Sequence, residues 1–393
     1  MSLRLFSRNA DLQRLRDEGY FVQIVDEKFL VIRQVPYVND KRQVRLGTLV
    51  AALELAGDLT RKPLNDHQVF FDGEYPCNAQ GVKLQIGGEG QRREIGPGLF
   101  VQHHFSQKPD GGYADYHHKM TTYHAMLAAP AAVVDPSIRP RQFAAPADDD
   151  PESIFEYPDT ASGRNGTAAL AALFKEEVLS LIGLGGTGAY ILDKVAKTPV
   201  RQIRLFDADE FLNHNAYRAP GAASLDELRE APMKVEYFKR MYSRMHRGIV
   251  SHPVSLGRAN AHLLDGTTFA FIAMDDGPEK LAVIEKLEAI GAIFTDVGMG
   301  LQLEEGLSLG GILRTTVSTP ERRDVVRRKV SFAPKEGGGV YETNIQVADL
   351  NSFNADLAVI KWKKLRGYYR DLERELHSTY TTDGNLLLSS DRA

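Results

Sequence analysis

The sequence predicts an α/β protein: a doubly wound, mostly parallel sheet preceded by a smaller α+β domain. Three observations predict this fold class. Between residues 178 and 300, apolar strand-like runs alternate with helical patterns, which is typical of a parallel sheet with helices on both faces. The first run, residues 178–182, leads directly into a glycine-rich turn. Residues 1–130 show short strand and turn patterns instead, and the chain is too long for one core.

The composition is that of an ordinary globular protein. Of the 393 residues, 43% are hydrophobic and 25% charged, and the net charge is −4, which argues against a nucleic-acid partner. No apolar run approaches the ~20 residues that span a bilayer. Residues 1–20 carry acidic side chains and lack the apolar core of a signal peptide. We therefore expect a cytoplasmic protein that binds neither membrane nor nucleic acid.

Residues 1–130 are expected to form the smaller domain. Short apolar runs mark its strands, and acidic or glycine-containing turns separate them. The predicted elements, in order, are a helix over 11–18, a hairpin of 20–25 and 28–32, a helix over 46–55, and strands over 67–71 and 82–86.

Histidines are concentrated near the end of this domain, at His103, His104, His117, His118 and His124. Imidazoles are common zinc ligands, so a metal site is conceivable. Adjacent histidines point to opposite sides of a strand, however, and no carboxylate or thiol lies at a recognisable ligand spacing. Structural or surface histidines are the favoured interpretation, and metal binding stays open.

Two further features of this domain concern partners and reactivity. Tyr113, Tyr116 and Tyr123, together with residues 117–119, form a candidate docking surface for a protein partner. Cys77 is the single cysteine, so the chain has no intrachain disulfide and no cysteine-rich zinc site. It lies in a predicted turn without an activating neighbour and is not favoured as a nucleophile.

A linker is expected over residues 131–166. Six prolines and the acidic run 148–150 fall between residues 130 and 166, and such a segment buries too little apolar surface to fold by itself. The linker separates a domain over 1–130 from a second domain over 167–393.

The second domain opens with a βαβ unit of Rossmann-like type. A buried strand over 178–182 runs into a glycine turn, a helix follows, and a second strand over 203–206 ends at Asp207. Glycines let the backbone approach a phosphate, and a helix N-terminus offers it free N–H groups. An acid closing the second strand suits ribose hydroxyls. The expected nucleotide-binding residues of the turn are Gly183, Gly185, Gly186, Thr187 and Gly188.

The alternation of strands and helices continues beyond residue 218. The predicted elements are a helix over 232–246, strands over 249–254 and 269–274, a helix over 279–290 and a strand over 292–295. After them come an added antiparallel strand over 310–317, a mobile basic loop over 321–335 and a last helix over 355–369.

A polar set follows the second strand. Asp209, Asn215 and Arg218 come within twelve positions of Asp207. A dinucleotide oxidoreductase does not need an Asn and an Arg there, whereas an enzyme that cleaves a triphosphate must meet the charge on the phosphates with fixed donors.

Two residues further along the chain complete the set. Lys234, at the start of the next helix, supplies a further cation. Asp275, at a strand end, is a suitable Mg²⁺ ligand. Taken singly, Arg218 and Lys234 also fit surface cations and Asp275 fits a helix cap, but their joint occurrence in this order favours ATP chemistry.

Together, the glycine turn and this polar set resemble the adenylation motif of ThiF, MoeB and the ubiquitin-activating enzymes, over residues 178–300. The resemblance implies an adenylyltransferase that uses ATP and Mg²⁺ to activate the C-terminal carboxylate of a ubiquitin-like protein, in a bacterial conjugation pathway. By the same resemblance the glycine turn cradles phosphate, Asp207 binds ribose and Asp275 binds Mg²⁺. Asn215, Arg218 and Lys234 would hold the phosphates.

The family is usually dimeric, with an arginine upstream of the glycine turn that reaches the partner's ATP. Arg164 is the candidate here, so a homodimer is expected. Residues 301–350 contain no cysteine, in contrast to ubiquitin-activating enzymes, and the zinc-binding cysteines of many ThiF-like proteins are also missing.

Without that cysteine, three routes remain for the acyl group. Transfer to a nucleophile of a partner, such as a ubiquitin-conjugating-enzyme-like protein, is favoured. The others are transfer to Cys77 or to a hydroxyl, the candidates being Ser318, Thr319, Ser331 and Thr343.

Three readings from other classes stay open. The first is an NAD(P)-dependent oxidoreductase built on the same βαβ unit. The second is a non-catalytic scaffold that binds ubiquitin-like proteins. The third keeps the activation chemistry but directs it at a small molecule or a tRNA base.

Overall fold

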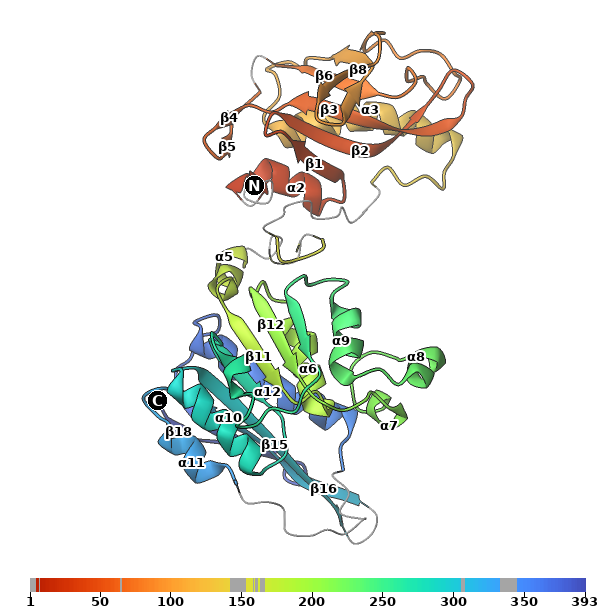
Figure 1. The fold of residues 1–393 in the computed structure, drawn as a ribbon. Coiled ribbons are helices and arrows are strands. Elements are labelled where there is room, and N and C mark those ends of the chain that lie inside the picture. Colours follow the sequence, from red (N-terminus) through yellow and green to blue (C-terminus); the bar gives the residue numbers. More distant parts are fainter. Residues whose placement is uncertain are drawn as a thin grey trace. The chain divides into compact units, whose positions relative to one another are not determined.

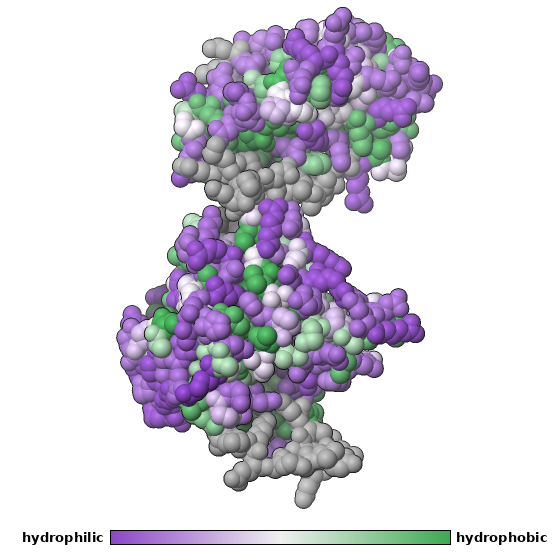
Figure 2. Space-filling view, viewed as in Figure 1, coloured by the Kyte–Doolittle hydropathy of each residue, from purple (hydrophilic) through white to green (hydrophobic). Residues whose placement is uncertain are grey.

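The structure is a computed structural model that describes residues 5–6, 8–63, 66–141, 153–157, 159, 162, 167–304, 308–332 and 345–393. The chain divides into two compact units (Figure 1). The N-terminal unit comprises Met1–Ser153 and Tyr157–Ala168, and the C-terminal unit comprises Ile154–Glu156 and Ala169–Ala393. Hydrophilic residues cover most of the face of the molecule shown in Figure 2. Among the described residues, no helix is both long and apolar enough to cross a bilayer.

The N-terminal unit is built on an antiparallel sheet. Within the described residues it has six strands in the order β1-β2-β3-β6-β10-β7. Their bounds are β1 Phe21–Val25, β2 Phe29–Val38, β3 Val44–Ala52, β6 Gln68–Asp72, β10 His103–Ser106 and β7 Gly87–Gly88. Two small hairpins accompany it, β4 Leu55–Ala56 with β5 Leu59–Thr60 and β8 Arg93–Gly96 with β9 Leu99–Val101.

Two helices cover one face of this sheet, α2 Ala10–Asp17 and α3 Tyr116–Val134. Leu12 of α2 and Met120 of α3 share a core with Leu30 and Phe71 of the strands. The β8–β9 hairpin packs on the other side, where Leu99 and Val101 meet Val31 and Val50.

Two predictions for this unit are wrong. Residues 46–55 were expected to be helical, but β3 occupies most of the range because it pairs with both β2 and β6. At Gly47 of β3 a Cβ would collide with the Phe71 ring of β6. The glycine therefore leaves the space that this ring occupies. Residues 82–86 form no strand: the Asn78 side chain accepts the N–H of Val82 in a tight turn, and Lys83 makes only an isolated bridge with Cys77.

The predicted docking surface is also wrong. Tyr113, Tyr116 and Tyr123 are at most 1% exposed, because all three belong to the core that α3 shares with the sheet. His124 is buried as well, and burial lowers its pKa to about 4. The described residues contain no group of three or more His, Cys, Asp or Glu side chains placed to hold a metal ion.

Cys77 is buried, and burial raises the pKa of its thiol. A raised thiol pKa disfavours a role as nucleophile.

The C-terminal unit contains a mixed sheet that has eight strands within the described residues, in the order β13-β12-β11-β14-β15-β16-β17-β18. The strands from β13 to β15 are parallel to one another, and β16 to β18 extend the sheet antiparallel. Their bounds are β11 Val178–Ile182, β12 Gln202–Phe206, β13 Ile249–His252, β14 Phe269–Ile272, β15 Ile293–Glu304, β16 Ser308–Ser318, β17 Glu375–Thr381 and β18 Leu386–Arg392.

Helices cover both faces of the parallel part (Figure 1). Leu179 and Leu181 of β11 face a core shared with α6 Gly186–Val195, α9 Lys234–Tyr242 and α12 Ala348–Leu365. Ile182 faces the opposite core, which contains side chains of α10 Pro278–Ala289 and α11 Asp324–Lys329. Shorter helical segments are α5 Ala168–Ala171, η1 Ala172–Phe174, α7 Asn213–Ala216, α8 Leu225–Glu230 and η2 Ala261–Leu264.

The βαβ unit and the added antiparallel strand are confirmed. The prediction of a loop over 321–335 is wrong at its centre, which forms α11. The basic side chains of this segment misled the sequence reading: Val325 and Val326 are buried, and Arg327 pairs with Glu288 at 2.6 Å.

A buried histidine in the C-terminal unit predicts loss of stability in acid. The N–H of Gly248 donates to His246 Nδ1 at 3.1 Å, so Nε2 carries the proton and donates to the Val200 carbonyl at 3.1 Å. Burial lowers the pKa of His246 to about 4. The unfolded chain therefore binds this proton first as the pH falls from about 6.5, and the folded state loses about 3 kcal/mol by pH ~4.

This loss is checked by measuring the free energy of unfolding against pH. His246→Gln should flatten the curve between pH ~6.5 and ~4, whereas His262→Gln, at an exposed position, should leave its slope unchanged. Equal slopes for the wild type and His246→Gln would contradict the assignment.

Candidate functional site

The glycine turn lies where the strand order reverses. Neighbours of β11 are β12 on one side and β14 on the other, and ligands of open α/β sheets bind at the carboxyl ends of strands at this reversal. Gly183 follows β11 with φ +89°, and a Cβ there would collide with the Ala273 carbonyl. A Cβ on Gly188 would collide with the Gly183 carbonyl, whereas one on Gly185 would meet no atom within 4 Å. The turn is thus closed toward the sheet and open at Gly185.

Helix α6 begins at Gly186, and no side chain caps its N-terminus. Its first-turn N–H groups and the positive end of its dipole are therefore available to an anion. The phosphate-binding role of the turn stays a prediction, and Gly185 is the position of the turn where a Cβ would meet no atom within 4 Å.

Asp207, at the end of β12, is tied to the turn. Its Oδ2 accepts the N–H of Leu184 at 2.7 Å and its Oδ1 accepts the N–H of Asp209 at 2.9 Å. The Lys234 ammonium lies 2.6 Å from Asp209 Oδ2 and 3.6 Å from Asp207 Oδ1, and its side chain is 7% exposed. The structure thus brings Asp207, Asp209 and Lys234 together as one ionic cluster, in which Lys234 neutralises carboxylates beside the turn.

Asn215 and Arg218 follow on the same side of the sheet. Asn215 is buried in α7, and its Oδ1 accepts the N–H of Leu212 at 2.9 Å, so it shapes this segment. The Nε of Arg218 is buried and has no hydrogen-bond partner in the described part of the chain. A buried guanidinium nitrogen without an acceptor is costly, so the hydrogen-bonding capacity of this side chain is not fully used within the described residues.

Asn351 of α12 belongs to this site, and the sequence reading missed it. Its carboxamide contacts both Thr187 and the main chain of Arg218. The last helix was expected to start at residue 355, which left Asn351 outside. The available signal was the spacing of Asn351, Asn354 and Ala358, which places two amides on the apolar stripe of one helix.

Asp275 is exposed in the loop after β14, at the carboxyl edge of the sheet. The residue after it, Asp276, enters a buried ionic network that sequence reasoning also missed. The Lys280 ammonium lies 2.8 Å from Asp276 Oδ1 and 2.7 Å from Asp296 Oδ1, and Arg314 Nη2 lies 2.6 Å from Asp296 Oδ2. Lys280 and Asp296 are at most 1% exposed. The loop that carries Asp275 is thus anchored to β15 by Lys280.

The remaining predicted residues do not reach this edge. Arg164 and Thr343 lie outside the described residues. Ser318 and Thr319 are buried, and Ser318 pairs with Phe294 near the start of β15, away from the glycine turn. The prediction that either hydroxyl accepts the acyl group is therefore wrong. Ser331 is exposed after α11.

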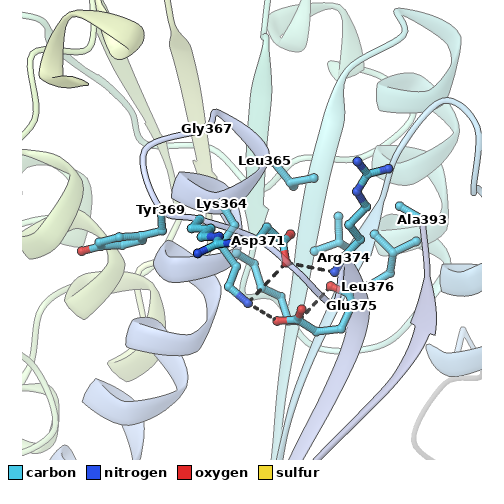
Figure 3. Close-up of a pocket in the computed structure, with 12 residues that line it drawn as sticks. Lys364, Leu365, Gly367, Tyr369, Asp371, Arg374, Glu375, Leu376 and Ala393 are labelled. Atoms are coloured by element: carbon cyan, nitrogen blue, oxygen red, sulfur yellow. Dashed lines mark hydrogen bonds and ion pairs between the residues drawn. The ribbon is translucent and has the colours of Figure 1, made fainter. Parts of the chain in front are cut away.

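A cavity of about 440 Å³ lies elsewhere in this unit (Figure 3). Lys364 and Glu375 pair at 2.7 Å in its wall, with Leu365 and Leu376 beside them. It adjoins the C-terminal end of α12, where Arg366 contacts the Thr268 carbonyl just before β14. This is the amino end of the parallel strands, so the cavity is separate from the glycine turn.

Comparison with known proteins gives limited matches. A family model described as a domain of unknown function (DUF6791) matches residues 10–160. No curated protein matches. Among solved structures, the chain is similar to PaaA, with 13% identity, 69% of this chain and 82% of that chain covered, and a TM-score of 0.47.

The chain is also similar to MccB in two further structures, the first of which is of the E. coli protein. For MccB with ATP the identity is 14%, the coverage is 59% of this chain and 72% of that chain, and the TM-score is 0.42. For the microcin C7 biosynthetic enzyme MccB with N-formylated MccA the identity is 16%, the coverage is 60% of this chain and 70% of that chain, and the TM-score is 0.43. The function is therefore inferred from the residues of the site itself.

Proposed function

We propose that the C-terminal unit is an ATP-dependent adenylyltransferase that activates the terminal carboxylate of a peptide or protein chain, specifically of a ubiquitin-like protein. One observation carries the proposal: the buried Nε of Arg218 has no hydrogen-bond partner among the described residues, and the Asn351 side chain links the Arg218 main chain to Thr187 in the first turn of α6, next to the open position Gly185. A cation held next to a phosphate-binding helix is suited to a reaction in which charge develops on phosphate.

In the proposed reaction, a carboxylate oxygen of the substrate attacks the α-phosphorus of ATP. The bond from that phosphorus to the oxygen bridging to the β-phosphate breaks, and pyrophosphate leaves with the electron pair, giving the acyl-adenylate. Arg218 and the α6 N–H groups bind phosphate oxygens, and Asp207 holds the turn through Leu184. No external proton donor is needed, because pyrophosphate leaves as an anion.

Mg²⁺ fits this edge of the sheet. Asp275 is exposed at the carboxyl end of β14, and carboxylate oxygens are the ligands that Mg²⁺ prefers. Asp275 would therefore hold the ion together with phosphate oxygens, and the bound ion would offset charge on the phosphates.

The acyl group then passes to a nucleophile of a partner, for which a ubiquitin-conjugating-enzyme-like protein is the proposed class. The burial of Cys77, Ser318 and Thr319 supports this route over transfer to any of those three side chains. A homodimer in which Arg164 reaches the second ATP remains part of the proposal, as does a place in a bacterial conjugation pathway.

The test is ATP–pyrophosphate exchange with a candidate ubiquitin-like protein that ends in a free glycine. Asp275→Ala should lower the exchange rate by about 10²-fold or more, because phosphate charge loses its metal. Asp226→Ala, which removes a carboxylate exposed on α8, is the control and should exchange at the wild-type rate.

Two outcomes would contradict the proposal. One is tight NADH binding with no exchange, which would favour the oxidoreductase reading. The other is unchanged exchange in Asp275→Ala.

A further inference from the structure

One carboxamide joins two segments of the proposed phosphate site. Asn351, in the first turn of α12, is fully buried. Its Oδ1 accepts a hydrogen bond from the Thr187 hydroxyl at 2.9 Å, and its Nδ2 donates to the Arg218 carbonyl at 3.3 Å. Thr187 belongs to the first turn of α6 and Arg218 follows α7, so a single side chain bridges the two.

Its hydrogen-bond partners fix the orientation of this carboxamide. A carbonyl oxygen can only accept, so Nδ2 must face Arg218 and Oδ1 must face Thr187. Gly186 gives the carboxamide its space, because a Cβ at that position would collide with Asn351. Lys194 of α6 pairs with Asp356 of α12 at 3.1 Å, which fixes the two helices against each other further along.

We propose that Asn351 is a positioning residue for nucleotide binding: it holds the main chain of Arg218, and with it the guanidinium, next to the N-terminus of α6. The inference rests on the proposed function, since it concerns ATP. Arg218 Nε has no hydrogen-bond partner within the described residues, so protein contacts to its main chain bear directly on where the cation is held. A donor that meets developing charge must be in place before the reaction.

The same helix supplies a matched control. Asn354, three residues later, is also fully buried, accepts from the Thr315 hydroxyl at 3.1 Å and donates to the Gly298 carbonyl at 3.1 Å. It makes the same two kinds of bond, but to β15 and β16 instead of the phosphate segments. Loss of either carboxamide should disturb the fold similarly, while only Asn351 should matter for ATP.

The experiment compares Asn351→Ala with Asn354→Ala in the full-length chain. Thermal unfolding is measured for each variant, together with the Kd for ATP by calorimetry and kcat/KM for ATP in pyrophosphate exchange. Both variants should unfold at lower temperature than the wild type. Only Asn351→Ala should raise the Kd for ATP, by about tenfold or more, because Arg218 is no longer held.

Equal ATP affinities in the two variants would overturn the inference, as would wild-type affinity in Asn351→Ala. If an alanine variant does not fold, Asn351→Ser and Asn354→Ser keep a polar group but are too short to reach both partners, and the same difference in affinity is expected. A wild-type chain that binds no ATP would instead refute the proposed function, whatever the variants do.

Discussion

Alanine at Gly185 should weaken ATP binding while the protein stays fully folded, whereas alanine at Gly188 should lower the stability of the fold. A Cβ on Gly185 meets nothing within 4 Å, and its φ of −68° is allowed for alanine. That methyl group would occupy the open space at the turn, where a phosphate is expected to approach the backbone. We expect the Kd for ATP to rise at least about tenfold, with an unchanged melting temperature.

The Gly188 variant is the matched comparison. Its Cβ would collide with the Gly183 carbonyl, and backbone atoms of a turn packed against the sheet cannot move cheaply. Overpacking of this kind costs about 3 kcal/mol, which lowers the melting temperature of a unit this size by about 6–12 °C. Thermal unfolding and ATP titration of both variants test the pair. A destabilised Gly185→Ala would show that the turn is closed at that position.

The local part of the C-terminal unit was predictable because its signals are local. The apolar run of β11, the glycine turn and the acid ending β12 lie within thirty positions of the sequence, and a parallel strand pair with a connecting helix is one compact unit. These signals also placed Asp207 at the end of the second strand, but they did not reveal that its carboxylate binds the glycine turn or that Lys234 neutralises Asp207 and Asp209.

The contacts that hold the site together were not predictable, because they join distant parts of the chain. Asn351 contacts Thr187, which lies 164 positions earlier in the sequence. No periodicity in the sequence indicates such a pair. Likewise, Lys280 and Arg314 share Asp296 because β15 and β16 meet in the sheet. In the sequence, Asp296 is only the residue after a predicted strand, and Arg314 is only a basic residue within a later predicted strand.

The N-terminal unit shows how tertiary pairing overrides propensity. Leu46 to Leu55 is rich in Leu and Ala, which favour a helix, yet β3 forms there because both neighbouring strands pair with it. The tyrosines before and within α3 were read as surface because histidines accompany them. Their rings instead fill the space between α3 and the sheet, which spacing alone could not show.

Removing the charge of Asp296 should destabilise the C-terminal unit more than removing that of Lys280. Asp296 is the shared anion of Lys280 and Arg314, at 2.7 and 2.6 Å, and is 0% exposed. Neither carboxylate oxygen makes an aligned hydrogen bond, so charge attraction dominates this contact. Asp296→Asn leaves two cations without their common partner, and breaking a buried pair costs about 3–5 kcal/mol.

Lys280→Met leaves less uncompensated buried charge than Asp296→Asn does. Asp296 keeps Arg314, and the Asp276 side chain, which is 27% exposed, can turn to water. Denaturant unfolding should therefore rank the wild type above Lys280→Met and that variant above Asp296→Asn. Lys280→Met should in addition weaken Mg²⁺-dependent ATP binding, because it releases the loop that carries Asp275 from β15. The reverse order of stability would contradict this prediction, because it would mean that Arg314 alone does not compensate the buried charge of Asp296.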